Sequence, residues 1–172
     1  MISDRLFEDT IGIINRWKPS KMYDNEDKYR EELIEFLRDE FGKVLNRFSF
    51  GPTRKISVRK ETGREFSDIA INRGRIGIEL KKDLKYKKDV DRLTGQIVGY
   101  KREYEDIIVV LVGKTDREAL ERCKEMLSYL MSRNAYYGLN REPRIKLIDK
   151  GSKSSSRDSR QRRPFDLPRF KF

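Results

Sequence analysis

The chain has no histidine among its 172 residues and a single cysteine, Cys123. Without histidine, catalysis by Ser-His-Asp or Cys-His arrangements is excluded, and so are histidine zinc ligands and histidine general bases. One cysteine can form neither an internal disulfide nor a thiolate zinc site. Any hydrolytic chemistry must therefore use carboxylates, lysine, tyrosine and a hard metal ion.

Long apolar runs are also missing. No segment is long enough to span a bilayer, and the first five residues, Met1 to Arg5, lack the basic-then-apolar pattern of a signal peptide. We therefore expect a soluble, intracellular protein in the cytoplasm, compatible with association with the nucleoid. Its length predicts one domain over residues 1–150.

Positive charge is abundant, with a formal net charge of +11 and an isoelectric point near 9.7. This balance favours a polyanionic partner, which is nucleic acid or an anionic membrane surface. Residues 151–172 are rich in Ser and Arg and are predicted to be a disordered, basic, low-complexity tail. The aromatic residues spaced among its charges could dock a protein partner or stack on DNA bases, or they could be incidental to a solubilising tail.

Hydrophobic periodicity predicts four helices, over residues 5–18, 23–41, 91–104 and 116–133. Strands are expected within 48–58, in a hairpin at 67–81, in a buried run at 107–113 and at 144–148. A basic stretch at 81–88 is expected to be a loop. This order predicts an α/β fold with a mixed central sheet flanked by helices.

The hairpin segment contains two acidic residues, Asp68 and Glu79, on either side of an Asn-Arg-Gly-Arg turn. With a tight, symmetric turn, the expected cross-strand pairs are Ile71 with Ile76, Ile69 with Ile78, and Asp68 with Glu79. A three-residue loop would change this register and separate the two acids. Because side chains alternate along a strand, both acids share a face with Lys81 and with two small residues, Ala70 and Gly77.

Two carboxylates opposite one another destabilise a sheet, and one of them resists ionisation. A cation between them removes the conflict. Mg²⁺ prefers oxygen ligands and takes one or two carboxylates, waters and substrate phosphate oxygens. Asp68 and Glu79 are therefore candidate metal ligands, with Mn²⁺ as a substitute ion, although a Glu-x-Lys pair on a strand is more often a solvated face.

Asp68, Glu79-x-Lys81 and a following helix that bears Gln96 resemble the PD-(D/E)xK nuclease superfamily. The expected element order matches its restriction endonuclease-like αβββαβ core, and the resemblance covers roughly residues 22–113. Ser67 stands where the motif's name has Pro. Members of the superfamily include restriction-type, end-processing and Holliday junction-resolving enzymes.

The resemblance implies a role for each matching residue. Asp68 and Glu79 would bind Mg²⁺, with the Leu80 carbonyl as a third protein ligand. Lys81 would position the attacking water or help to deprotonate it. Gln96 would contact the substrate backbone or the water network, unless it only binds the edge of the sheet.

The superfamily often adds a glutamate from its first helix, and here Glu26, Glu31 and Glu32 compete for that role. Glu26 lies three and seven residues before the apolar Tyr29 and Leu33, on the inward stripe of the predicted helix. We expect Glu26 to join the site, with Glu32 second, unless all three are solvated charges.

Together these residues predict a Mg²⁺-dependent endonuclease, a deoxyribonuclease that hydrolyses DNA phosphodiester bonds. A homodimer is compatible with the short chain, above all if two strands are cut. Gly95 and Gly99 lie one turn apart, and glycine costs about 1 kcal/mol in a helix, so a strand or a phosphodiester is expected close by. The alternatives are a catalytically inactive nucleic-acid-binding protein of the same fold and a membrane-surface or ribonucleoprotein scaffold.

Overall fold

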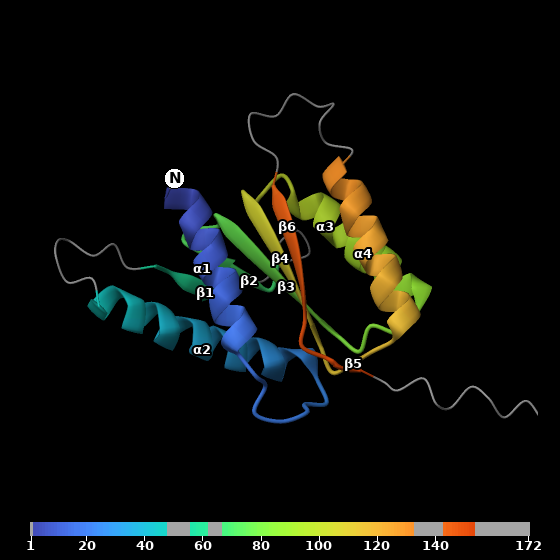
Figure 1. The fold of residues 1–172 in the computed structure, drawn as a ribbon, viewed down its shortest axis with the longest axis horizontal. Coiled ribbons are helices and arrows are strands. Elements are labelled where there is room, and N and C mark those ends of the chain that lie inside the picture. Colours follow the sequence, from blue (N-terminus) through green and yellow to red (C-terminus); the bar gives the residue numbers. More distant parts are fainter. Residues whose placement is uncertain (1, 48–55, 62–66, 133–142, 154–172) are drawn as a thin grey trace, which may run out of the picture.

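A computed structural model describes residues 2–47, 56–61, 67–132 and 143–153 (Figure 1). Its centre is a five-stranded sheet with the order β1-β2-β3-β4-β6. The strands are β1 (Val58–Lys60), β2 (Ile69–Ile71), β3 (Ile76–Lys82), β4 (Asp106–Val112) and β6 (Arg144–Asp149). The first three strands pair antiparallel, whereas β4 pairs parallel with both β3 and β6. The expected mixed sheet is confirmed.

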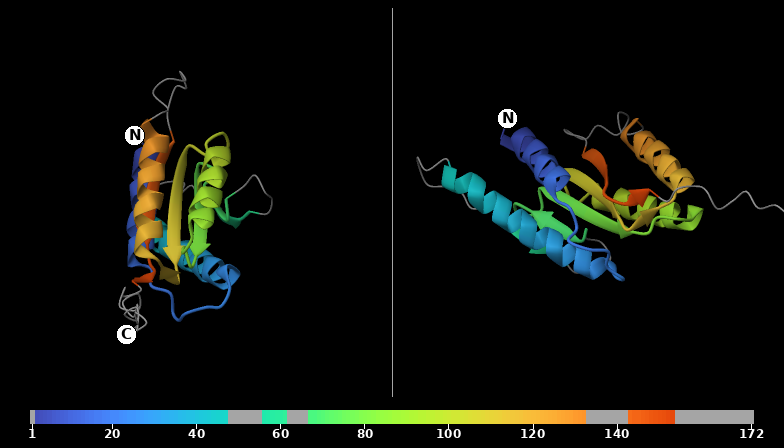
Figure 2. Two further views of the ribbon diagram at one scale, coloured as in Figure 1. Left: turned by 90° about the vertical axis from the view of Figure 1, so that its right-hand side faces the viewer. Right: turned by 60° about the horizontal axis from the view of Figure 1, so that its bottom comes forward.

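Helices cover both faces of this sheet (Figure 2). They are α1 (Ile2–Arg16), α2 (Glu26–Arg47), α3 (Lys87–Tyr100) and α4 (Arg117–Ser132). One apolar cluster joins α1 and α2 to the sheet, and a second joins α3 and α4 to its other face. The α/β class predicted from the sequence is therefore confirmed. None of the helices in the described ranges has the length and apolar character that a membrane span requires.

All seven residues of β4 are buried, which explains the unbroken apolar sequence from Ile107 to Val112; the buried Asp106 at its start pairs with Arg144. Ile108 and Val110 face the α1 and α2 side, while Ile107 and Val109 face α3 and α4. Because helices cover both faces of β4, neither face is in contact with solvent, and its side chains do not alternate between apolar and polar. β3 differs, because one of its faces carries Ile76, Ile78 and Leu80 and the other carries Glu79.

Several element boundaries differ from the sequence-based expectation. The helix expected at 91–104 is α3, which begins at Lys87 and ends at Tyr100. The Asp89 carboxylate accepts a 3.0 Å hydrogen bond from the Tyr86 backbone N–H and thereby caps an earlier start. The basic stretch at 81–88 is consequently divided between β3, a short loop and α3. The helix expected at 23–41 is α2, which begins later and ends later.

A second, two-stranded sheet escapes prediction entirely. It pairs β5 (Lys114–Thr115) in parallel with β7 (Ser152–Lys153). Ser152 and Lys153, which the sequence assigns to the predicted tail, form β7. The rest of the predicted tail, residues 154–172, lies outside the described residues, as does most of the loop and strand expected at 48–58.

Candidate active site

The hairpin between β2 and β3 has the expected register. Ile69 pairs with Ile78 and Ile71 with Ile76. The turn uses left-handed backbone at three consecutive residues, with φ of 50° at Asn72, 62° at Arg73 and 86° at Gly74. Asp68 directly precedes β2, so continuing this pairing by one residue brings it opposite Glu79.

Tyr104, which follows α3, packs against the hairpin next to the two acids. Tyr104 packs so closely over Gly77 that an added Cβ there would lie 2.8 Å from its ring. The Tyr104 hydroxyl also accepts a 3.2 Å hydrogen bond from the Ser67 N–H. The Ser67 hydroxyl in turn donates to the Ile69 carbonyl at 3.0 Å. Glycine in β3 therefore lets Tyr104 hold the residue just before Asp68.

Both carboxylate oxygens of Asp68 accept hydrogen bonds. Oδ2 accepts the Leu80 backbone N–H at 2.8 Å, which ties the residue directly to β3. Oδ1 accepts from the Arg30 guanidinium of α2 at 2.7 Å. The Leu80 side chain is fully buried in the α1 and α2 cluster, so only its backbone belongs to the site.

Glu79 is the most enclosed acid of the site, with 4% of its surface exposed. Its Oε2 accepts a 3.0 Å hydrogen bond from the Tyr100 hydroxyl of α3. Burial, and after it the neighbouring charge of Asp68, raise the pKa of Glu79 to about 8, against the opposing effect of the Tyr100 hydrogen bond. Burial and the neighbouring Glu79 carboxylate also raise the pKa of Tyr100. The expected conflict between two like charges is therefore present.

Of the three competing glutamates, the structure brings Glu26 to this cluster. Its Oε2 accepts the Lys82 backbone N–H at 2.7 Å and lies 4.0 Å from the Lys81 ammonium. Burial raises the pKa of Glu26, while the Lys82 hydrogen bond and the Lys81 charge lower it. Glu32 instead accepts hydrogen bonds from Trp17, Ser20 and Tyr23, and Glu31 is an exposed partner of Lys60.

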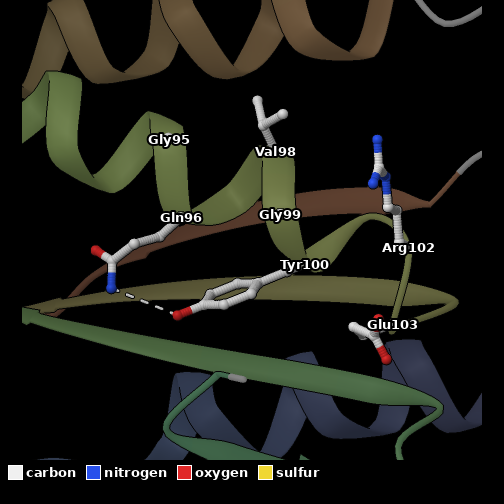
Figure 3. A pocket seen from close by; sticks show the side chains of 7 residues that line it. All are labelled: Gly95, Gln96, Val98, Gly99, Tyr100, Arg102 and Glu103. Atoms are coloured by element: carbon white, nitrogen blue, oxygen red, sulfur yellow. Dashed lines mark hydrogen bonds between the residues drawn. The ribbon is translucent and has the colours of Figure 1, made fainter. Parts of the chain in front are cut away.

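Gln96 lies beside the acids rather than among them. Its Nε2 donates to the Tyr100 hydroxyl over 3.4 Å, and Figure 3 shows both side chains projecting from α3 towards β3. Its Oε1 is buried and has no hydrogen-bond partner in the described part of the chain. Both residues help to line a surface pocket of about 450 Å³ along α3. Gln96 therefore reaches Glu79 only through Tyr100.

Arg30 is a member of the site that the sequence did not predict. Its guanidinium contacts Asp68 and also Asp27, one turn earlier on α2, and it lowers the pKa of Glu26. Arg30 follows Glu26 by four positions, so both lie on one face of α2. That spacing is a signal that could have suggested Arg30, but only once Glu26 had been placed.

The donor set suits a hard divalent cation, because Asp68, Glu79 and Glu26 offer only oxygen atoms. Within the described ranges, however, no three acidic or cysteine side chains come together in an arrangement that could hold a metal ion. A cation at this place would need backbone carbonyl, water or substrate oxygens besides Asp68 and Glu79. The repulsion that raises the pKa of Glu79 is the feature that a cation would relieve.

Comparisons of the chain with family models, with curated proteins and with solved structures find no significant match. The class that the fold itself defines is an α/β protein with a mixed, open five-stranded sheet between two pairs of helices. Its distinguishing feature is the cluster of Asp68, Glu79, Glu26, Lys81 and Arg30 around the β2–β3 hairpin.

Proposed function

We propose that the protein is a Mg²⁺-dependent nuclease that hydrolyses DNA phosphodiester bonds. The observation that carries this proposal is the convergence of Asp68 and the buried Glu79 on one hairpin, with Lys81 and Glu26 alongside. Burying carboxylates next to one another costs free energy that a stable fold has no structural reason to retain. Binding a divalent cation and a phosphodiester supplies such a reason.

The order of elements supports a restriction endonuclease-like core. The segment α2, β1, β2, β3, α3, β4 repeats the expected order of one helix, three strands, one helix and one strand. In this arrangement Asp68 directly precedes the second strand, Glu79 lies on the third strand, and Gln96 lies on the helix that follows. Fold alone does not define an activity, so the proposal depends on the site residues.

The proposed chemistry divides among the named residues. Asp68 and Glu79 would hold Mg²⁺ together with the Leu80 carbonyl, and the bound ion would supply a nucleophilic water of lowered pKa and neutralise phosphate charge. Lys81, held 4.0 Å from Glu26, would orient the attacking water, and Glu26 would accept its proton. Tyr100 would keep the Glu79 carboxylate oriented by its hydrogen bond.

The outer face of α3 offers a surface for the DNA backbone. Four exposed residues follow one another there at helical spacing, Lys88, Arg92, Gly95 and Gly99, and the exposed Arg102 continues the row in the turn after α3. An added Cβ at either glycine would meet nothing within 4 Å, so no strand among the described residues requires them. The two explanations for these glycines were close approach of a strand and close approach of a phosphodiester. The second therefore remains, with the phosphodiester lying between the basic side chains of Arg92 and Arg102. Asp91 and Glu103 border this face and would limit non-specific binding.

Replacing Gly99 by alanine should move stability and DNA binding in opposite directions. The free energy of unfolding should rise by up to about 1 kcal/mol, because alanine favours a helix and nothing obstructs its methyl group. DNA affinity should fall about fivefold, which corresponds to about 1 kcal/mol of binding free energy. Chemical denaturation and fluorescence anisotropy with a labelled duplex measure the two effects.

Gly42→Ala in α2 is the matched control, because Gly42 also has nothing within 4 Å of an added Cβ. It should stabilise the protein without changing DNA affinity. Equal DNA affinity for Gly99→Ala and Gly42→Ala would remove α3 from the proposed DNA surface.

Incubation with branched, linear duplex and single-stranded DNA tests the proposed function directly. Cleavage should require Mg²⁺ or Mn²⁺ and should stop when a chelator is added. Cleavage that continues in chelator would reject the metal mechanism. Salt-sensitive binding without cleavage of any substrate would favour the alternative, a nucleic-acid-binding protein that performs no chemistry.

A further inference from the structure

The Arg30 side chain of α2 lies directly against Asp68, one of the two proposed metal ligands. Its Nη1 donates to Asp68 Oδ1 at 2.7 Å and its Nη2 donates to Asp27, and only 15% of the side chain is exposed. Asp68 thereby directs one oxygen at a guanidinium and the other at the Leu80 N–H. The carboxylate best placed to bind a cation already has a cation beside it.

One hydrogen-bond donor of Arg30 has no acceptor among the described residues. Its Nε is buried and has no hydrogen-bond partner among the described residues. A buried donor left without an acceptor is unfavourable, so any movement that supplies an acceptor stabilises the guanidinium. Asp27, its other acceptor, has 61% of its side chain exposed and can follow such a movement.

We propose that Arg30 is a phosphate-positioning residue that neutralises Asp68 until a divalent cation takes over that carboxylate. This inference rests on the proposed function. A phosphate oxygen bound to Mg²⁺ lies about 2.1 Å from the ion. Arg30 Nη1 lies 2.7 Å from Asp68, so the released guanidinium would already be next to that phosphate. Guanidinium groups bind phosphate oxygens through paired, charge-assisted hydrogen bonds.

In this exchange Arg30 leaves Asp68 for the substrate phosphate, and the cation takes over the neutralisation of the Asp68 charge. Before the cation arrives, Arg30 offsets the negative charge of Asp68, which it contacts, and lowers the pKa of the neighbouring Glu26. After it arrives, the same side chain turns towards the substrate. Arg30 should therefore oppose cation binding when DNA is absent and favour DNA binding when the cation is present.

The test compares Arg30→Met with Lys28→Met, which removes one positive charge from an exposed position of the same helix. Isothermal titration of the DNA-free proteins with Mn²⁺ should give a dissociation constant about tenfold lower for Arg30→Met than for wild type, within the usual range of coupling between sites. Anisotropy with duplex DNA in Ca²⁺, to suppress cleavage, should show a dissociation constant about tenfold higher. Lys28→Met should change each constant less than threefold.

Arg30→Lys keeps a charge but loses the guanidinium fork, and it serves if Arg30→Met fails to fold. It should restore wild-type Mn²⁺ affinity while leaving DNA affinity reduced. Unchanged or weaker Mn²⁺ binding by a folded Arg30→Met protein would overturn the inference, and so would DNA binding no weaker than that of Lys28→Met. The Mn²⁺ titrations also separate the role of Arg30 from the proposed function. If neither the wild-type protein nor any variant binds Mn²⁺, the metal site itself is overturned.

Discussion

Asp68→Asn should lower the rate of DNA cleavage in Mg²⁺ about a thousandfold, which corresponds to about 4 kcal/mol of transition-state stabilisation. The amide keeps the size of the carboxylate and can still accept the Leu80 N–H, so the hairpin should remain folded. What it loses is the negative charge that would hold the cation. Single-turnover cleavage of a labelled duplex measures the rate, and circular dichroism checks the fold.

Asp39→Asn is the matched control for this variant. Asp39 is an exposed carboxylate of α2 that pairs with Lys43, far along the helix from Glu26. Its replacement should leave cleavage unchanged. If the folded Asp68→Asn protein cleaves DNA within tenfold of the wild-type rate, Asp68 has no part in the chemistry.

Glu79→Gln should stabilise the metal-free protein, and the gain should grow as the pH rises. In the folded protein burial and Asp68 raise the pKa of Glu79 from 4.5 to about 8. Between these values the folded state holds a proton that the unfolded chain has released, so the free energy of unfolding falls with rising pH. Each pH unit is worth up to about 1.4 kcal/mol, and glutamine has no proton to lose.

Urea denaturation in chelator at pH 5, 6.5 and 8 measures this difference between variant and wild type. The two proteins should be of similar stability at pH 5, and the variant should be more stable by a few kcal/mol at pH 8. Glu31→Gln, at an exposed position of α2, should show no such trend. A constant difference across this pH range would mean that Glu79 ionises normally and is not in conflict with Asp68.

The register of the hairpin was predictable because each of its determinants is local. Turn residues that accept left-handed backbone and the alternation of isoleucines specify the pairs of β2 with β3. Once that register holds, Asp68 and Glu79 must meet. The inward position of Glu26 followed from its spacing to Tyr29 on the same helix.

Contacts between distant segments were not predictable from local pattern. Arg30 reaches Asp68 across 38 positions of the chain, and nothing near Arg30 in the sequence marks that partner. The bond from Tyr100 to Glu79 likewise depends on how α3 lies over β3. In the sequence Tyr100 occupies an apolar position of an amphipathic helix, and its ring does pack in the apolar cluster. Only its hydroxyl belongs to the site, and the sequence pattern does not indicate that.

The same reason explains the missed strand β7. Ser152 and Lys153 have no apolar pattern, and their sequence is typical of a solvated tail. They pair with Lys114 and Thr115, which follow β4 directly. Backbone hydrogen bonding to a neighbouring segment requires no particular side chain, so composition could not reveal it.

Anomalous diffraction from a crystal soaked in Mn²⁺ tests the central claim most directly. One strong peak is expected at the hairpin, within bonding distance of a carboxylate oxygen of Asp68 and one of Glu79. A peak at only one of these residues, or a crystal in which Mn²⁺ binds elsewhere and leaves both acids uncoordinated, would contradict it.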